Sequence, residues 1–229
     1  MSEGEQKVDH TEEINVPASS EIRLNLFIIG LVSSSVQLLL LREILNISGG
    51  YELVTGIFLG SWLIGSSIGA ALAGSSKLVD RGKINLIFSL APVCSIAMMF
   101  FLGRMFLNTG ETPSFLVSLV YTFLVLLPFC ITSGFTFVKL ISFAGSGNYL
   151  SAGKSFSIET VGGVVSGILI SFLTSGLLNT YQLLLLTILL SVSYVLLSYY
   201  IITPGYKLTA RIVICVLAVL IILTSPDMR

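Results

Sequence analysis

Apolar residues along this chain gather into long runs that short polar connections separate. The runs cover residues 22–41, 53–73, 84–106, 114–143, 158–178, 181–202 and 209–224. A helix that crosses a bilayer needs about 20 predominantly apolar residues, and only a helix or a closed barrel satisfies its backbone hydrogen bonds in lipid. The pattern therefore predicts an all-α integral membrane protein, a bundle of about seven transmembrane helices within residues 22–224.

The ends of the chain and one proline qualify this prediction. Residues 1–21 are polar and are expected to form a disordered cytoplasmic tail, whereas residues 225–229 form a short C-terminal tail. Pro128 lies in the middle of the long fourth run, where a missing backbone donor predicts a kink or a division of the helix. The seventh run is the shortest.

Composition excludes several classes of function. Hydrophobic residues make up 54% of the chain and charged residues 10%, against about 25% charged residues in a typical soluble domain. Twelve basic residues balance twelve acidic ones, so no nucleic-acid surface is predicted and the bilayer is the expected partner. Cys94, Cys130 and Cys215 have no CxxC spacing and are interpreted as small apolar residues. We therefore expect no metal and no cofactor.

The distribution of basic residues predicts an orientation. Nine of them lie in the N-terminal tail and in the second, fourth and sixth connections: Lys7, Arg23, Lys77, Arg81, Lys83, Lys139, Lys154, Lys207 and Arg211. The opposite side holds Arg42, Arg104 and Arg229. The positive-inside rule then places the N-terminus in the cytoplasm and, with seven spans, the C-terminus outside.

Two spans begin with a similar pattern. The same four residue types, with the same spacing, occur in the second and the fifth span: Glu52, Val54, Gly56 and Gly60 in the second, and Glu159, Val161, Gly163 and Gly167 in the fifth. Three spans separate the two sets, so the helices run in opposite directions, as in an inverted repeat of three plus three helices with one extra helix. The alternative is two unrelated glycine-rich helices. In either case the small-xxx-small pairs Gly56/Gly60, Gly65/Gly69 and Gly163/Gly167 predict surfaces for helix packing.

Much of residues 26–178 resembles the membrane module of bacterial spermidine synthase-like membrane proteins. The resemblance rests on Gly30-Leu-Val-Ser-Ser-Ser-Val-Gln37 running into Leu41-Arg42-Glu43, on the glycine-spaced second span, and on Ile158-Glu-Thr-Val-Gly-Gly163. It implies a bundle like half of a major facilitator transporter, in the bacterial inner membrane. The aminopropyltransferase domain often fused to that module has no counterpart here, so its chemistry does not carry over.

The connection around Asp80, Arg81 and Lys83 resembles the cytoplasmic loop between the second and third spans of major facilitator transporters. Its spacing departs from that pattern. The alternative interpretation is an ordinary basic loop on the cytoplasmic side.

Charged and amide side chains near apolar runs are the candidate functional residues, because charge within a bilayer is costly. Glu52 and Glu159 would receive a cation or a proton at the two mouths of a central path, with Gln37 supplying an amide nearer the interior. The alternative is that both carboxylates cap helix N-termini. Arg42 and Glu43 are expected to pair with neighbours that include Glu52.

Two functions remain open at this stage. The first is a transport-type bundle for a small cationic solute, polyamine-like by analogy with the family. The second is a membrane anchor or scaffold subunit of a larger complex. We expect a homo-oligomer or an assembly with other subunits. An enzyme is not predicted, because the spans contain no catalytic constellation.

Overall fold

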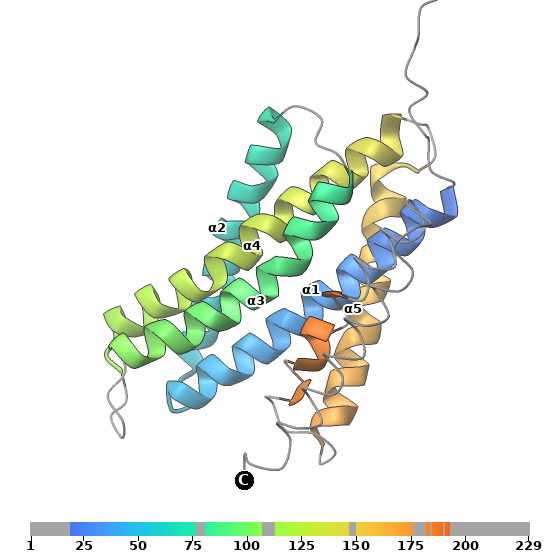
Figure 1. Ribbon diagram of the computed structural model, residues 1–229. Helices are drawn as coiled ribbons and strands as arrows, with labels where there is room; N and C mark the ends of the chain where they lie inside the picture. Colours follow the sequence, from blue (N-terminus) through green and yellow to red (C-terminus); the bar gives the residue numbers. More distant parts are fainter. Residues whose placement is uncertain are drawn as a thin grey trace, which may run out of the picture.

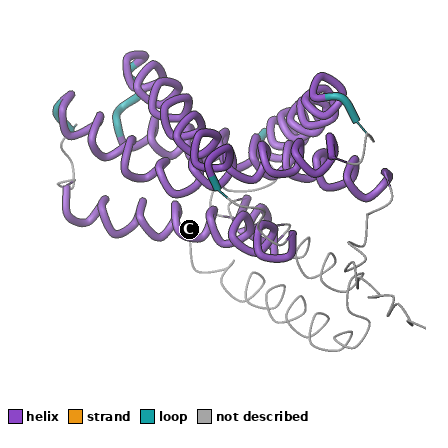
Figure 2. Tube along the Cα trace, turned by 90° about the horizontal axis from the view of Figure 1, so that it is seen from above, coloured by secondary structure: helices purple, strands orange, loops and turns teal. Residues whose placement is uncertain are grey.

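The computed structural model describes residues 19–76, 81–106, 113–146 and 150–175, together with 182–183, 185–189 and 191–192. In this part of the chain all regular structure is helical (Figure 2). Five helices occur in the order α1 (Ser19–Ile47), α2 (Glu52–Ser75), α3 (Arg81–Phe106), α4 (Phe115–Ser146) and α5 (Ala152–Thr174). All five are long and apolar enough to cross a membrane, which agrees with the prediction of a multi-span helical bundle.

The described residues do not confirm a count of seven helices. Residues 182–183, 185–189 and 191–192 are helical and fall within the predicted sixth span. Leu183, Thr187 and Ser191 are buried there at intervals of four residues, as one inward face of a helix requires. The predicted seventh span, 209–224, lies outside the described residues, as does most of the predicted N-terminal tail.

Successive helices alternate in direction, so the bundle has two ends (Figure 1). The α1/α2 end holds the end of α1, the start of α2, the end of α3, the start of α4 and the end of α5. The α2/α3 end holds the opposite termini. As a result α1 and α5 run in the same direction, and so do α2 and α4 (Figure 1).

The helices form two groups. Contacts are most extensive between α2 and α4 and between α1 and α5, and α3 packs on α4. Contacts of α1 with α4 and α2, and of α4 with α5, are much fewer. We call the two units the α1–α5 pair and the α2–α3–α4 group, and we call the boundary where α1 meets α4 the seam.

Glycines explain how closely each group packs. A methyl group at Gly30 of α1 would overlap the backbone carbonyl of Glu159, and one at Gly162 of α5 would overlap that of Phe27. In the other group, a methyl at Gly69 of α2 would overlap the carbonyl of Ile131. The absence of a side chain therefore lets the backbones touch where lipid gives helices no hydrophobic drive to associate.

The predicted glycine pairs behave differently from one another. Gly65 faces Cys130 of α4, whose Cβ would lie 2.7 Å from an added methyl, so Gly65 and Gly69 form a packing surface as predicted. A methyl at Gly163 would lie 2.6 Å from the Ser34 hydroxyl, and one at Gly167 would just reach Leu38, at 4.0 Å.

No described helix packs on Gly56 or Gly60, so their role as a packing surface stays a prediction. An added methyl group at either position would meet nothing within 4 Å. These glycines lie on the side of α2 that faces away from α4, so no described helix uses them as a packing surface.

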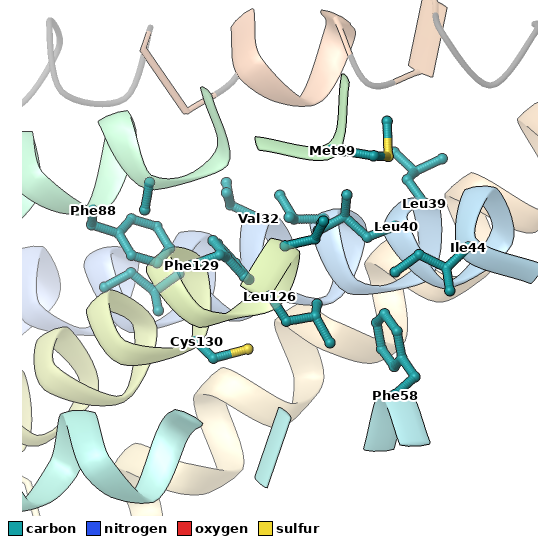
Figure 3. Close-up of a cluster of buried hydrophobic side chains, with 14 of the residues drawn as sticks. Val32, Leu39, Leu40, Ile44, Phe58, Phe88, Met99, Leu126, Phe129 and Cys130 are labelled. Carbon is teal, nitrogen blue, oxygen red and sulfur yellow. The ribbon is translucent and has the colours of Figure 1, made fainter. Parts of the chain in front are cut away.

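The core lies between the two groups and is built mainly from α1 and α4. Half of the most apolar window of α1 is buried inside the chain, against 11% of that of α5. Figure 3 shows Leu39 and Leu40 of α1 in the same buried cluster as Met99 of α3 and Leu126 of α4. The exposed side chains of α5 are largely apolar, for example Ile168 and Phe172, which suits a face turned to lipid.

Two prolines lie inside helices. α4 continues through Pro128 as one helix and is not divided. The Thr132 hydroxyl donates to the backbone carbonyls of Pro128 and Phe129, at 2.8 and 2.9 Å, the kind of side-chain support that lets proline persist in a membrane helix. Pro92 inside α3 was not singled out from the sequence.

Candidate functional site

The seam is bridged by polar side chains at its middle. The hydroxyl oxygens of Ser33 on α1 and Ser133 on α4 lie 3.1 Å apart in a buried hydrogen bond. The Gln37 side-chain amide, one turn along α1, donates to the Ser33 hydroxyl across 3.5 Å. Gln37 is half-buried. Its amide therefore lies where the two groups meet, and its contact with a solute stays a prediction.

The α1–α5 crossing is bridged differently, although it uses the neighbouring serines. The hydroxyl oxygens of Ser35 and Ser166 lie 2.7 Å apart and both side chains are buried. Gly162 and Gly30 bring the two backbones together one to two turns away. Successive residues of a helix point about 100° apart, so the run Ser33-Ser34-Ser35 serves two different neighbours.

Glu159 is half-buried and lies two turns inside α5, which begins six residues before the predicted start of the span. The N-cap of α5 is Ser151, whose hydroxyl accepts a hydrogen bond from the Lys154 amide at 3.4 Å. The alternative role of Glu159 as a helix cap is therefore wrong. Its own backbone carbonyl forms the contact with Gly30.

Glu52 has a different setting. It is the first residue of α2, exposed at the α1/α2 end, where its charge complements the helix dipole. Tyr51 occupies the cap position without a side-chain hydrogen bond. The structure does not bring Glu52 near Glu159, because Glu52 lies at the α1/α2 end and Glu159 lies toward the α2/α3 end. The capping interpretation thus suits Glu52 alone.

The predicted cytoplasmic loop is described only in part. Arg81 is the first residue of α3 and Lys83 is exposed on its first turn. Asp80 lies outside the described residues. The described residues of this loop therefore do not distinguish a loop like that of major facilitator transporters from an ordinary basic connection.

Sequence reasoning missed two buried charges. Lys139 of α4, which the sequence analysis counted among the basic residues of the connections, is 5% exposed and donates through Nζ to the carbonyl of Ser76 at 2.8 Å. Ser76 caps the C-terminal end of α2, so a cation meets the negative end of a helix dipole. The signal for this role was the position of Lys139 inside an apolar run, four residues before that run ends.

Glu43 is the second buried charge. It is 8% exposed, because α1 continues through Arg42 and Glu43 to Ile47 instead of ending at residue 41. No ion pair joins Arg42, Glu43 and Glu52 among the described residues, so the predicted fastening of this loop by charge pairs is not found there.

Other chemistry is sparse in the described part of the chain. It contains no group of three His, Cys, Asp or Glu side chains placed to hold a metal ion. Cys94 is exposed and Cys130 is buried, and both are free thiols. Cys130 packs against Gly65 and so behaves as a small apolar residue, whereas Cys215 lies outside the described residues.

Comparison with known proteins adds no assignment: no family model, curated protein or solved structure matches the chain.

Proposed function

We propose that this chain is a transport-type membrane bundle that moves a small organic cation across the bacterial inner membrane. In this proposal the α1–α5 pair rocks against the α2–α3–α4 group across the seam. The carrying observation is the contrast in packing: backbone contacts at glycines hold each group together, whereas the two groups meet through apolar side chains of the core and a hydroxyl pair, with fewer close approaches of their backbones. Rigid-body rocking of one bundle against another is a common route to alternating access.

We also infer an inverted repeat, in a register that differs from the one that Glu52 and Glu159 suggested, and the contacts at four glycines support it. Gly30 and Gly162 contact each other's helices in the α1–α5 pair, and Gly134 and Gly69 do the same between α4 and α2. The two helix pairs run in opposite directions (Figure 1).

This register aligns small residues of α5 and α2. Gly162, Gly163, Ser166 and Gly167 correspond to Gly69, Ala70, Ala73 and Gly74. Under this alignment Glu159 corresponds to Ser66. A methyl group at Gly30 would overlap the backbone carbonyl of Glu159, and a methyl group at Gly134 would likewise overlap the backbone carbonyl of Ser66. Inverted repeats of this kind place the substrate site near the midplane, between the repeats.

The cargo is proposed from charge and from the family resemblance. A carboxylate in a span favours a cationic solute, and Glu159 is a half-buried carboxylate of this kind. The resemblance to spermidine synthase-like membrane modules favours a polyamine-like cation. We propose a function outside the enzymes, in keeping with the described residues, which bring no catalytic constellation together.

A disulfide lock tests the proposal. In a variant without the native cysteines, Ser33→Cys with Ser133→Cys would cross-link the seam, and Ser35→Cys with Ser166→Cys would cross-link the α1–α5 crossing. In proteoliposomes, oxidation should abolish uptake of radiolabelled putrescine or spermidine in the seam variant, and reduction should restore it. The crossing variant serves as the matched control and should transport in both states. Equal uptake by the oxidised and reduced seam variant would contradict rocking across the seam.

The alternative, an anchor or scaffold subunit, is favoured by one observation. Gly56 and Gly60 form a small-xxx-small pair on α2 that no described helix covers, and such a pair suits close approach of another transmembrane helix. Gentle purification followed by native mass spectrometry tests it. Stoichiometric foreign subunits that are lost in Gly56→Leu would favour the scaffold function, whereas a homo-oligomer would favour transport.

A further inference from the structure

Three polar residues follow one another along one flank of the α1–α5 pair. Glu159 of α5 meets α1 at Gly30, because a methyl group at Gly30 would overlap the Glu159 carbonyl. One turn further along both helices, an added methyl at Gly163 would lie 2.6 Å from the Ser34 hydroxyl. Gln37 follows Ser34 by three residues, so it lies one more turn along the same face of α1. We call Glu159, Ser34 and Gln37 the polar flank.

α4 contacts both helices of the pair beside the polar flank. On the α1 side, the Ser133 hydroxyl of α4 lies 3.1 Å from the hydroxyl of Ser33. On the α5 side, the ring of Phe137, one turn after Ser133, packs edge-on against Phe156, with ring centroids 6.3 Å apart. Phe156 lies one turn before Glu159. The polar flank therefore lies where α4 meets the α1–α5 pair.

The side-chain oxygens of the polar flank are accessible. Among the described residues, no hydrogen bond is made to the Glu159 carboxylate, the Ser34 hydroxyl or the side-chain carbonyl of Gln37, whose amide donates to Ser33. All three side chains are half-buried, and none of these oxygens is among the fully buried atoms without a partner. Ionisable and polar groups in membrane spans commonly line a solute or ion pathway. Three acceptors in a row and one carboxylate therefore suit a ligand that brings N–H donors and positive charge.

Glycine keeps the space beside the Ser34 hydroxyl open. A side chain at Gly163 would displace this hydroxyl, because the first added carbon already lies 2.6 Å from it. Gly167, one turn further along α5, has no such contact, since an added methyl there would only reach Leu38 at 4.0 Å. Of the two glycines, only Gly163 therefore adjoins a polar group of the flank.

We propose that the polar flank binds an extended polyamine, with a primary ammonium group at Glu159 and Ser34 and a further amino group at Gln37. The carboxylate and hydroxyl oxygens accept N–H donors, of which an ammonium group has three, and the carboxylate offsets its charge. Gln37 lies seven residues beyond Gly30, about 10 Å along the axis of α1, so the ligand needs a second amino group at a distance from the first.

This inference rests on the proposed function, because it gives the transported cation its contacts. All three residues belong to the α1–α5 pair. In rocking across the seam the site would therefore move with that pair as one unit.

Direct binding to the purified full-length protein tests the inference without requiring transport. Titration with spermidine should give saturable binding, and putrescine, with its two amino groups closer together, should bind more weakly. Propylamine, with one ammonium group, should bind at least about tenfold more weakly than spermidine, and choline, which carries no N–H donor, should not compete. Glu159→Gln keeps the shape and removes the charge, and it should weaken spermidine binding at least about tenfold. Ser34→Ala should weaken it about threefold to tenfold.

The two glycines supply a matched pair of variants. Gly163→Ala should weaken spermidine binding about threefold or more, because its methyl displaces the Ser34 hydroxyl. In a Ser34→Ala background the same change should have no further effect. Gly167→Ala is the control and should leave the affinity unchanged. Equal affinities of the Gly163→Ala and Gly167→Ala variants would contradict the role of the Ser34 hydroxyl.

A measurement on the unmodified protein covers the case in which Glu159→Gln fails to fold. A hydrophobic carbodiimide should label Glu159, as located by mass spectrometry, and spermidine should protect it whereas choline should not. Equal affinity of the Glu159→Gln variant, or labelling of Glu159 that spermidine leaves unchanged, would overturn the inference.

These outcomes are separable from those of the seam cross-link. Spermidine binding that depends on Glu159, in a protein whose uptake ignores the seam disulfide, would keep this site and reject transport by rocking. Uptake that the seam disulfide blocks, in a protein whose spermidine binding ignores Glu159→Gln, would keep the proposed function and reject the site.

Discussion

The α1–α5 crossing and the α1–α4 seam share one helix, and serine hydroxyls bridge both, yet they are built on different principles. At the crossing, glycines of both helices bring the backbones into contact and the hydroxyl pair is short, at 2.7 Å. At the seam the hydroxyl pair is 3.1 Å, and the Gln37 amide lies beside it. The difference teaches that small residues bring the backbones together at one boundary of α1, whereas the other boundary has fewer close approaches of the backbones and is bridged by polar side chains. The proposed rocking uses the second boundary.

The largest expected effect comes from filling a crossing. Gly30→Ala and Gly69→Ala should each destabilise the protein by about 2–3 kcal/mol, because the methyl group overlaps a backbone carbonyl of the facing helix. Thermal unfolding in detergent measures the change. Gly56→Ala is the matched control, since its methyl meets nothing within 4 Å, and it should shift stability by less than about 1 kcal/mol. Equal losses in all three variants would show that these glycines act otherwise than by close packing.

The next largest effect concerns Lys139 at the α2/α3 end. Lys139→Met should cost about 1–2 kcal/mol, because the Ser76 carbonyl loses a charged donor and the end of the α2 dipole loses its cation. Lys139→Arg keeps the charge and should recover most of the loss in the same unfolding assay. A Met variant as stable as the parent would mean that the contact is energetically neutral.

Smaller effects should separate the two hydroxyl pairs. Double-mutant cycles with alanine at Ser35 and Ser166, and at Ser33 and Ser133, should each give a coupling energy near 0.6 kcal/mol, which is typical of membrane hydrogen bonds. The pair in the crossing should couple more strongly, because its hydrogen bond is shorter. Stronger coupling across the seam would reverse the proposed contrast.

The smallest effect is expected at Ser95. Its buried hydroxyl has no partner among the described residues, so Ser95→Ala removes an unsatisfied group and should leave stability within about 0.5 kcal/mol of the parent, or slightly raise it. Thermal unfolding again reports the change. A clear loss of stability would reveal that the hydroxyl has a partner in the folded protein.

The sequence predicted the helical membrane class and most helix positions, because long apolar runs leave few alternatives in lipid. Boundaries failed where charged or polar residues continue a helix. Ala152–Ser157 belong to α5 because Ser151 caps it, and Glu43 became buried because α1 extends to Ile47. As a result, Glu159 lies inside α5 and not at its end, and Glu43 is a buried residue of α1 and not part of the connection between α1 and α2.

Tertiary relations were less accessible from sequence. Gly56/Gly60 and Gly65/Gly69 have identical spacing, but they lie on different faces of α2, and only the second pair meets α4 among the described helices. Spacing identifies a surface that allows close approach and does not identify its partner. The amide of Gln37 lies beside Ser33 at the seam, a partner that the sequence did not indicate, and its predicted contact with a solute stays a prediction.

The central claim is that the α1–α5 pair and the α2–α3–α4 group move as units across the seam. Spin labels on a cysteine-free background at Leu116 of α4 and Phe172 of α5, both exposed at the α1/α2 end, report distances between the groups by pulsed electron resonance. Labels at Leu116 and Phe101 of α3 report distances within one group. The account predicts that putrescine shifts the distance distribution between the groups and leaves the distribution within the group unchanged. A distribution between the groups that is single, narrow and insensitive to putrescine would contradict it.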